Sequence, residues 1–177
     1  EGLGLLENGE WRFFFFFSLN APTRNIRHFA RVLGPSGEIW RLLSTESGLF
    51  RIDDALQFKR INTPWQSPDV ANHVLARPTK SGHELWFATQ RSGVYRLQNE
   101  RWTHFLADGI GPAWVVSRLV EQVDSNGRSW LWAASGAGLA RFDGERWQLL
   151  KQFDDIDLGG FNTISLISEA GGPVLWA

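Results

Sequence analysis

The sequence contains no cysteine and no methionine, and neither charge is in clear excess. Without cysteine, neither a disulfide framework nor a thiolate metal site can form. Lysine and arginine number 18 against 19 aspartate and glutamate, which gives a net charge of −1. Because no basic cluster is present to follow a phosphate backbone, we expect no nucleic-acid partner.

Long apolar runs are also missing. The longest, Phe13–Phe17, is far shorter than the ~20 residues that cross a bilayer, so we expect this segment itself to make no membrane contact. The chain opens at Glu1 instead of a methionine. We therefore expect it to be cut from a longer product, with any signal peptide or membrane anchor lying elsewhere.

A ten-residue pattern organises what is present. Residues 138–147 read GLARFDGERW, residues 2–11 and 93–102 match them without a gap, and residues 48–58 match with one insertion. An aliphatic residue followed by tryptophan keeps nearly the same period, and these tryptophans are Trp40, Trp86, Trp132 and Trp176. A period of about 45 residues built on strand-like segments is typical of a radial β-repeat.

Each unit reads as four short antiparallel strands. In the clearest unit they cover residues 74–78, 84–89, 94–97 and 101–105, with turn residues between them. First strands are expected at 27–33, 119–123 and 164–168, and second strands at 39–43, 130–134 and 174–177. The sequence thus predicts an all-β propeller of four-stranded blades with almost no helix. Residues 1–177 form one segment of about four blades' worth, with repeats at about 2–47, 48–92, 93–137 and 138–177.

The fourth strand of each unit carries a large apolar residue three positions after its aromatic residue. The pairs are Trp11 with Phe14, Phe58 with Ile61, Trp102 with Phe105, and Trp147 with Leu150. Residues three apart on an unbroken strand face opposite sides of a sheet. We therefore expect each blade to pack against neighbours on both of its faces.

The repeat resembles a known family. Residues 120–144, VEQVDSNGRSWLWAASGAGLARFDG, are similar to the two-component regulator propeller repeat, and residues 39–53 and 85–96 match the same template. The Asn that opens the family's inner strand is kept at Asn72 and Asn162, whereas Ser117 replaces it in the third unit. The resemblance implies a periplasmic or extracellular sensor segment of a membrane signalling protein, usually a hybrid histidine kinase or a diguanylate cyclase.

The resemblance also raises the question of ring closure, since family rings commonly have seven blades. The four units could close as a four-bladed ring, or they could form part of a larger propeller. Unpaired sheet edges tend to pair with other strands, so we expect the two ends of the segment to contact another copy of the chain or missing blades.

Aromatic residues in the connecting segments are the candidates for ligand contact. Exposed tryptophans on rigid loops suit stacking on sugar faces or docking of a partner, and nearby polar residues would supply hydrogen bonds. The candidates are Trp65, Trp114 and Phe161, with Arg24, Asp69, Asn72 and Asn162. The alternative is that these aromatics pack over the base of their own loops.

A cofactor or metal ion is not expected. The four histidines, His28, His73, His83 and His104, show no ligand-like spacing, although His28 and His73 could face a central channel. The acidic run at 154–157 lacks the calcium-loop pattern.

The aromatic run at 13–17 stands apart from the repeat. An outer strand needs alternate apolar residues, whereas Phe13, Phe15 and Phe17 belong to five consecutive phenylalanines. Such a segment predicts an interaction surface covered by a partner chain or by a missing domain.

These observations predict a non-catalytic sensor segment that binds a small molecule, an oligosaccharide or a protein partner. Two alternatives stay open. A glycan-active propeller hydrolase or lyase needs paired carboxylates near the ring axis, where first strands offer only Glu121 and Glu169. An assembly scaffold would instead bury the phenylalanine run between subunits.

Overall fold

The computed structural model describes residues 2–7, 9–15, 25–66, 68–80, 82–107, 114–124, 126–153, 155–169 and 172–177. Every regular element in these ranges is a β-strand. No helix in this part of the chain could therefore cross a membrane. The predicted all-β class is confirmed.

Three complete four-stranded antiparallel sheets make up the centre of the molecule, and in each the strands lie in chain order. The first contains β3 (Ile26–Leu33), β4 (Ile39–Thr45), β5 (Gly48–Ile52) and β6 (Phe58–Ile61). The second contains β7 (Ala71–Thr79), β8 (Gly82–Thr89), β9 (Val94–Gln98) and β10 (Arg101–Phe105). The third contains β11 (Val116–Val123), β12 (Ser129–Ser135), β13 (Gly138–Phe142) and β14 (Trp147–Leu150).

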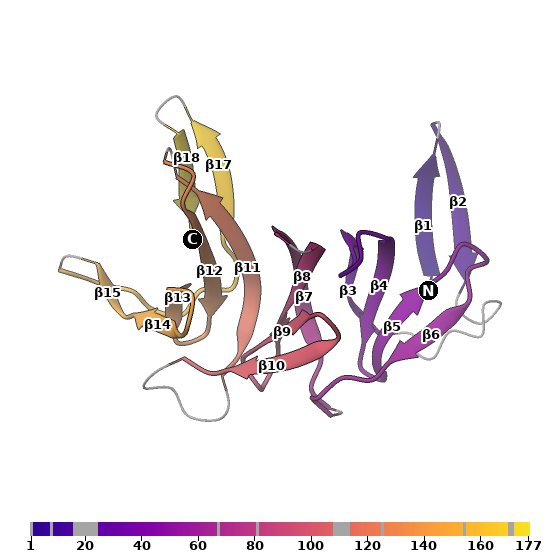
Figure 1. The fold of residues 1–177 in the computed structure, drawn as a ribbon, viewed down its shortest axis with the longest axis horizontal. Helices are drawn as coiled ribbons and strands as arrows, with labels where there is room; N and C mark the ends of the chain where they lie inside the picture. The colour runs from indigo at the N-terminus through magenta and orange to yellow at the C-terminus, as the bar shows by residue number, and fades with distance from the viewer. Residues whose placement is uncertain are drawn as a thin grey trace.

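Two-stranded sheets lie at both ends of this series. They are β1 (Gly2–Glu7) with β2 (Glu10–Phe15), and β17 (Ser165–Glu169) with β18 (Gly172–Trp176). Figure 1 shows the sheets side by side in an open arc, with β1–β2 at one end, β17–β18 at the other, and β3, β7 and β11 toward the concave side. The described sheets thus form an open arc and do not close as a four-bladed ring.

One small hairpin was not predicted. The strands β15 (Gln152–Phe153) and β16 (Ile156–Asp157) pair within the connection that follows the third blade. Two-residue strands are too short to produce an alternating apolar pattern, so the sequence indicates only a loop there.

The recurrent Thr/Ser and Gly of the repeat build the turn between the second and third strands. The Thr89 hydroxyl donates to the Gly93 carbonyl at 2.9 Å, and the Ser135 hydroxyl donates to the Gly138 carbonyl at 2.7 Å. Gly93 has φ 80°, and a Cβ there would lie 2.7 Å from the Phe105 carbonyl oxygen. Only glycine fits this turn without strain, which explains why it recurs.

The repeated tryptophan of the second blade packs in the core between the second and third blades. Trp86 is fully buried, and its indole N–H donates to Glu84 Oε1 at 2.8 Å. Arg96 on the next strand covers the ring, with its guanidinium 5.5 Å from the ring centre. In the first blade Trp40 repeats this arrangement, donating to Glu38 at 2.6 Å. The repeat residues therefore satisfy the indole N–H as well as filling the core.

Both faces of a blade are covered, as predicted from the outer strands. Trp102 packs into the cluster between the first and second blades, with Leu42, Phe87 and Tyr95. Phe105, three residues on, packs into the cluster between the second and third blades, with Trp86 and Trp147. The odd spacing thus joins two blade interfaces through one strand.

An arginine crosses the second interface. Arg77 on β7 donates through Nε to Glu121 on β11 at 2.9 Å and through Nη1 to Glu84 on β8 at 3.0 Å. Its Nη2 donates to Ser129 on β12 at 2.9 Å. A half-buried planar guanidinium thereby fixes the position of the third blade against the second.

Candidate functional site

A cavity of about 480 Å³ opens at the junction of the first and second blades. We call it the rim pocket. It forms where β6 ends and the chain crosses toward β7. It is lined by Gly48, Arg60, Ile61, Asn62, Thr63, Trp65, Gln66 and Asp69. Two of the predicted ligand residues, Trp65 and Asp69, therefore lie in one cavity.

Trp65 forms the apolar wall of the rim pocket. It is only 5% exposed. Its ring lies 5.0 Å from that of Tyr95 and 5.6 Å from that of Phe87, and it meets Trp102 edge-on at 5.4 Å. Because protein aromatics surround it, Trp65 anchors the loop, as in the packing alternative, and it does not stand free as a stacking platform.

Asp69 holds the loop to the next blade. Its Oδ1 accepts the backbone N–H groups of Val70 and Arg91, both at 2.9 Å. The second oxygen, Oδ2, is buried and has no hydrogen-bond partner among the described residues. A buried carboxylate oxygen without a partner is costly, so this atom is suited to accept a hydrogen bond from a ligand.

Other polar groups of the rim pocket were not identified from the sequence. Arg60, Asn62 and Gln66 are exposed, and no described residue hydrogen-bonds their side chains. Thr63 donates its hydroxyl to the Trp65 carbonyl at 3.0 Å, which sets the turn of the loop. These four residues belong to no repeated motif, so the sequence gives no indication of them. Only the path of the loop after β6 brings them together.

The remaining predicted ligand residues are not brought into this pocket. Trp114 is fully buried and meets Trp147 at 5.8 Å, in the core between the second and third blades. Phe161 packs beside Ile164 in another cluster, whereas Asn162 is exposed. Arg24 lies outside the described residues.

Asn72 instead joins blades at the inner strands. It lies at the bulge of β7, and its Nδ2 donates to the Val116 carbonyl of β11 at 3.0 Å. Ser117, at the equivalent bulge 45 residues on, donates to the Phe161 carbonyl at 3.3 Å. The Asn position thus links the second blade to the third, and Ser117 keeps the equivalent link from the third blade to the connection before β17.

The predicted interaction surface on β2 is partly described. Phe13 is 65% exposed and stacks on Trp11, with ring centres 5.9 Å apart. The side chain of Phe15 and the whole of Phe17 lie outside the described residues. Leu6 on β1 is exposed as well. An apolar face on the first hairpin is therefore present, and what covers it stays a prediction.

Two histidines lie side by side on the inner strands. The rings of His28 on β3 and His73 on β7 are 4.9 Å apart. The backbone N–H of Leu119 on β11 donates to Nδ1 of His73, with 3.4 Å between the nitrogens. Burial, followed by the charges of His28 and Arg118, lowers the pKa of His73 to about 3. Burial and Arg118 also lower the pKa of His28.

This lowered pKa predicts an acid-labile blade junction. Between about pH 6.5 and pH 3 the unfolded chain binds a proton at His73 that the folded chain rejects, so stability falls as the pH falls. After discounting for partial exposure, we expect this histidine to cost about 2 kcal/mol of unfolding free energy between pH 7.5 and pH 4.5. Denaturant titrations at the two pH values measure it.

The matched control is a histidine outside the cluster. In His73→Gln the acid-induced loss of unfolding free energy should be smaller by about 2 kcal/mol. In His104→Gln, on the outer strand β10, the full loss should persist. An unchanged acid response in His73→Gln would show that the histidine pair does not carry it.

Both first-strand carboxylates, Glu121 and Glu169, accept hydrogen bonds from other side chains of the protein. Glu121 is bound by Arg77 and by the hydroxyl of Ser129, and Glu169 accepts the indole N–H of Trp176 at 3.3 Å. In the described part of the chain, no group of three or more His, Asp or Glu side chains is placed to hold a metal ion.

Comparison with known proteins identifies the fold of the chain. No protein-family model and no curated protein matches the chain. A solved structure from B. thetaiotaomicron does, described as the extracellular domain of the hybrid two-component system BT4673, with 19% identity and a TM-score of 0.68. The chain has the fold of this extracellular domain. A second structure, described as the same domain of a one-component system, matches with 17% identity and a TM-score of 0.67.

The structural match covers 98% of this chain but only 24% of either solved chain. The chain therefore spans about a quarter of the length of these domains, which agrees with the open arc of blades. The predicted propeller resemblance is confirmed at the level of the fold.

Proposed function

We propose that this chain is a non-catalytic input segment of a membrane signalling protein, located on the periplasmic or extracellular side. The support is the fold shared with extracellular domains of a two-component system. Any kinase or cyclase activity would belong to an output domain elsewhere in the same protein. The engaged carboxylates Glu121 and Glu169 favour this proposal over a glycan hydrolase.

The rim pocket is where this segment takes its ligand, and a neutral oligosaccharide suits the lining best. Hydroxyl groups both donate and accept hydrogen bonds. Asp69, whose Oδ2 has no hydrogen-bond partner among the described residues, lines the pocket with the amides Asn62 and Gln66 and the donor Arg60. The single observation that carries the proposal is the buried, unpartnered oxygen of Asp69.

Binding at the rim pocket would reach the rest of the protein through the blade junction. The lining comes from the end of the first blade and from the loop that Asp69 ties to Arg91 in the second. A ligand that contacts both sides favours one relative position of the two blades. Such a preference is sufficient to shift a population between two states of a sensor dimer.

The test is Asp69→Asn with titration calorimetry against a panel of neutral oligosaccharides. An amide keeps an oxygen for the two backbone N–H groups but replaces the free acceptor with a donor. We expect about a tenfold or greater loss of affinity, since a hydrogen bond to a charged group contributes roughly 1.5–3 kcal/mol.

Asp124→Asn is the matched control. Its Oδ1 likewise accepts two backbone N–H groups, from Asn126 and Arg128, in a hairpin turn of the third blade. The control should bind normally. A saccharide held equally well by Asp69→Asn would contradict the pocket assignment, and a panel without any binder would contradict the ligand class.

A further inference from the structure

A second cavity lies on the inner strands, away from the rim pocket. It has a volume of about 540 Å³ and runs between β3 and β7. We call it the inner-strand groove. Apolar side chains form most of its surface: Val32, Leu33, Val74, Leu75, Ala76 and Pro78. Such a surface suits an apolar body and offers little to a polyhydroxylated one.

Positive charge accompanies this apolar surface. Arg31 lines the groove and is exposed. Its cross-strand neighbour is Arg41, whose own guanidinium is neutralised by Asp54 at 2.6 Å. Arg118 on β11 lies near enough to His73 to lower its pKa. No described residue forms an ion pair with Arg31 or Arg118, and no carboxylate lines the groove.

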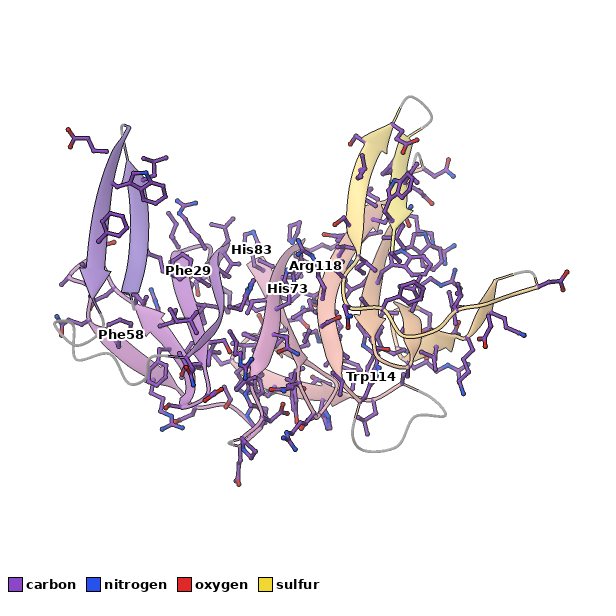
Figure 2. All side chains as sticks on the ribbon, turned by 180° about the vertical axis from the view of Figure 1, so that it is seen from behind. Phe29, Phe58, His73, His83, Trp114 and Arg118 are labelled. Carbon is purple, nitrogen blue, oxygen red and sulfur yellow. The ribbon has the colours of Figure 1, made fainter. Side chains whose placement is uncertain are left out.

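Histidines complete the polar side of the groove. His73 and His83 both line it, and Figure 2 shows them with Arg118 near the middle of the arc. Nδ1 of His83 is buried and has no hydrogen-bond partner among the described residues. Arg31 has no ion-pair partner among the described residues and no acid lines the groove, so the groove favours an anion, because an unbalanced cation beside an apolar surface attracts opposite charge.

We propose that the inner-strand groove binds a monocarboxylic acid with an apolar body. The carboxylate pairs with Arg31, whose planar guanidinium can engage both oxygens, and the apolar body covers Val32, Leu33 and Leu75. This site differs from the rim pocket in ligand class and in location, so either can fail without the other.

Charge and shape together define the ligand class. An organic ammonium of the same size would meet the cationic Arg31 and be repelled. A small inorganic anion would pair with Arg31 but leave the apolar surface of the groove exposed to water. Each methylene that leaves water adds about 0.8 kcal/mol, so affinity is expected to rise with chain length until the groove is filled.

The probes are acetate, butyrate, hexanoate and octanoate, titrated by calorimetry into the protein. We expect affinity to increase along the series and octylammonium not to bind. Arg31→Gln should weaken octanoate binding by about tenfold or more, the loss of a charge-assisted pair. Arg101→Gln, an exposed arginine on the outer strand β10, serves as the control and should bind normally.

Three results would overturn the proposal: an affinity that does not depend on chain length, equal binding by Arg31→Gln, or binding of octylammonium as tight as that of octanoate. The chain-length series needs no variant, so it decides the matter even if a substitution disturbs folding.

Discussion

Replacing Trp86 with alanine is expected to lower the free energy of unfolding by about 3–5 kcal/mol, the range for deleting a buried aromatic side chain. The ring is fully buried between the second and third blades. Its ring centre lies 5.0 Å from that of Phe142, 5.3 Å from that of Phe105 and 6.1 Å from that of Trp147. The substitution also leaves Glu84 without the indole N–H that it accepts. Chemical denaturation followed by circular dichroism measures the change.

The repeat supplies its own control. Trp176 occupies the same motif position in the last hairpin but is 56% exposed, because β17–β18 has no third or fourth strand among the described residues. Trp176→Ala is expected to cost less than about 1 kcal/mol. Equal losses at the two positions would contradict the blade assignment.

Replacing Arg77 with methionine is expected to lower the free energy of unfolding about as much as Trp86→Ala. The change keeps most of the side-chain volume but removes the cation shared by Glu84 and Glu121, which are largely withdrawn from solvent. Breaking a buried pair by removing one partner costs about 3–5 kcal/mol, because the other charge stays buried and uncompensated. Chemical denaturation followed by circular dichroism measures this change as well.

The matched control for Arg77 is an exposed ion pair in the first blade. Arg41 lies 2.6 Å from Asp54, whose side chain is 91% exposed. Exposed pairs contribute about 0–1 kcal/mol, so Arg41→Met should change stability little. If Arg77→Met were no more destabilising than Arg41→Met, the inter-blade role of Arg77 would be wrong.

The sequence predicts the strands well because their signals are local. In the second blade the expected strands at 84–89 and 101–105 fall within the observed Gly82–Thr89 and Arg101–Phe105. The first strand extends further than predicted, to Ala71, because a bulge between Ala71 and His73 interrupts the alternation of apolar residues. Period-2 patterns therefore locate a strand but miss the part beyond its bulge.

The candidate site is less predictable because its residues depend on distant contacts. Trp65 lies in a loop outside the repeat pattern, so the sequence left open both ligand contact and packing over the base of the loop. Its burial comes from Phe87, Tyr95 and Trp102, all at least 22 residues further along the chain. No residue near Trp65 in the sequence indicates these contacts. Asp69 was identified as a polar candidate, but its bond to the Arg91 amide required the structure.

The equivalent inner-strand residues give the most direct test of the side-by-side blades on which both pockets depend. The natural chain has no cysteine, so a double variant His28→Cys/His73→Cys carries only the introduced pair. The two rings lie 4.9 Å apart in the structure. We predict rapid crosslinking by a short bifunctional thiol reagent, and its loss in denaturant. The pair His28→Cys/Thr163→Cys, in which the second and third blades lie between β3 and the residue before β17, should not crosslink within the monomer. Crosslinking of the second pair but not the first would contradict the account.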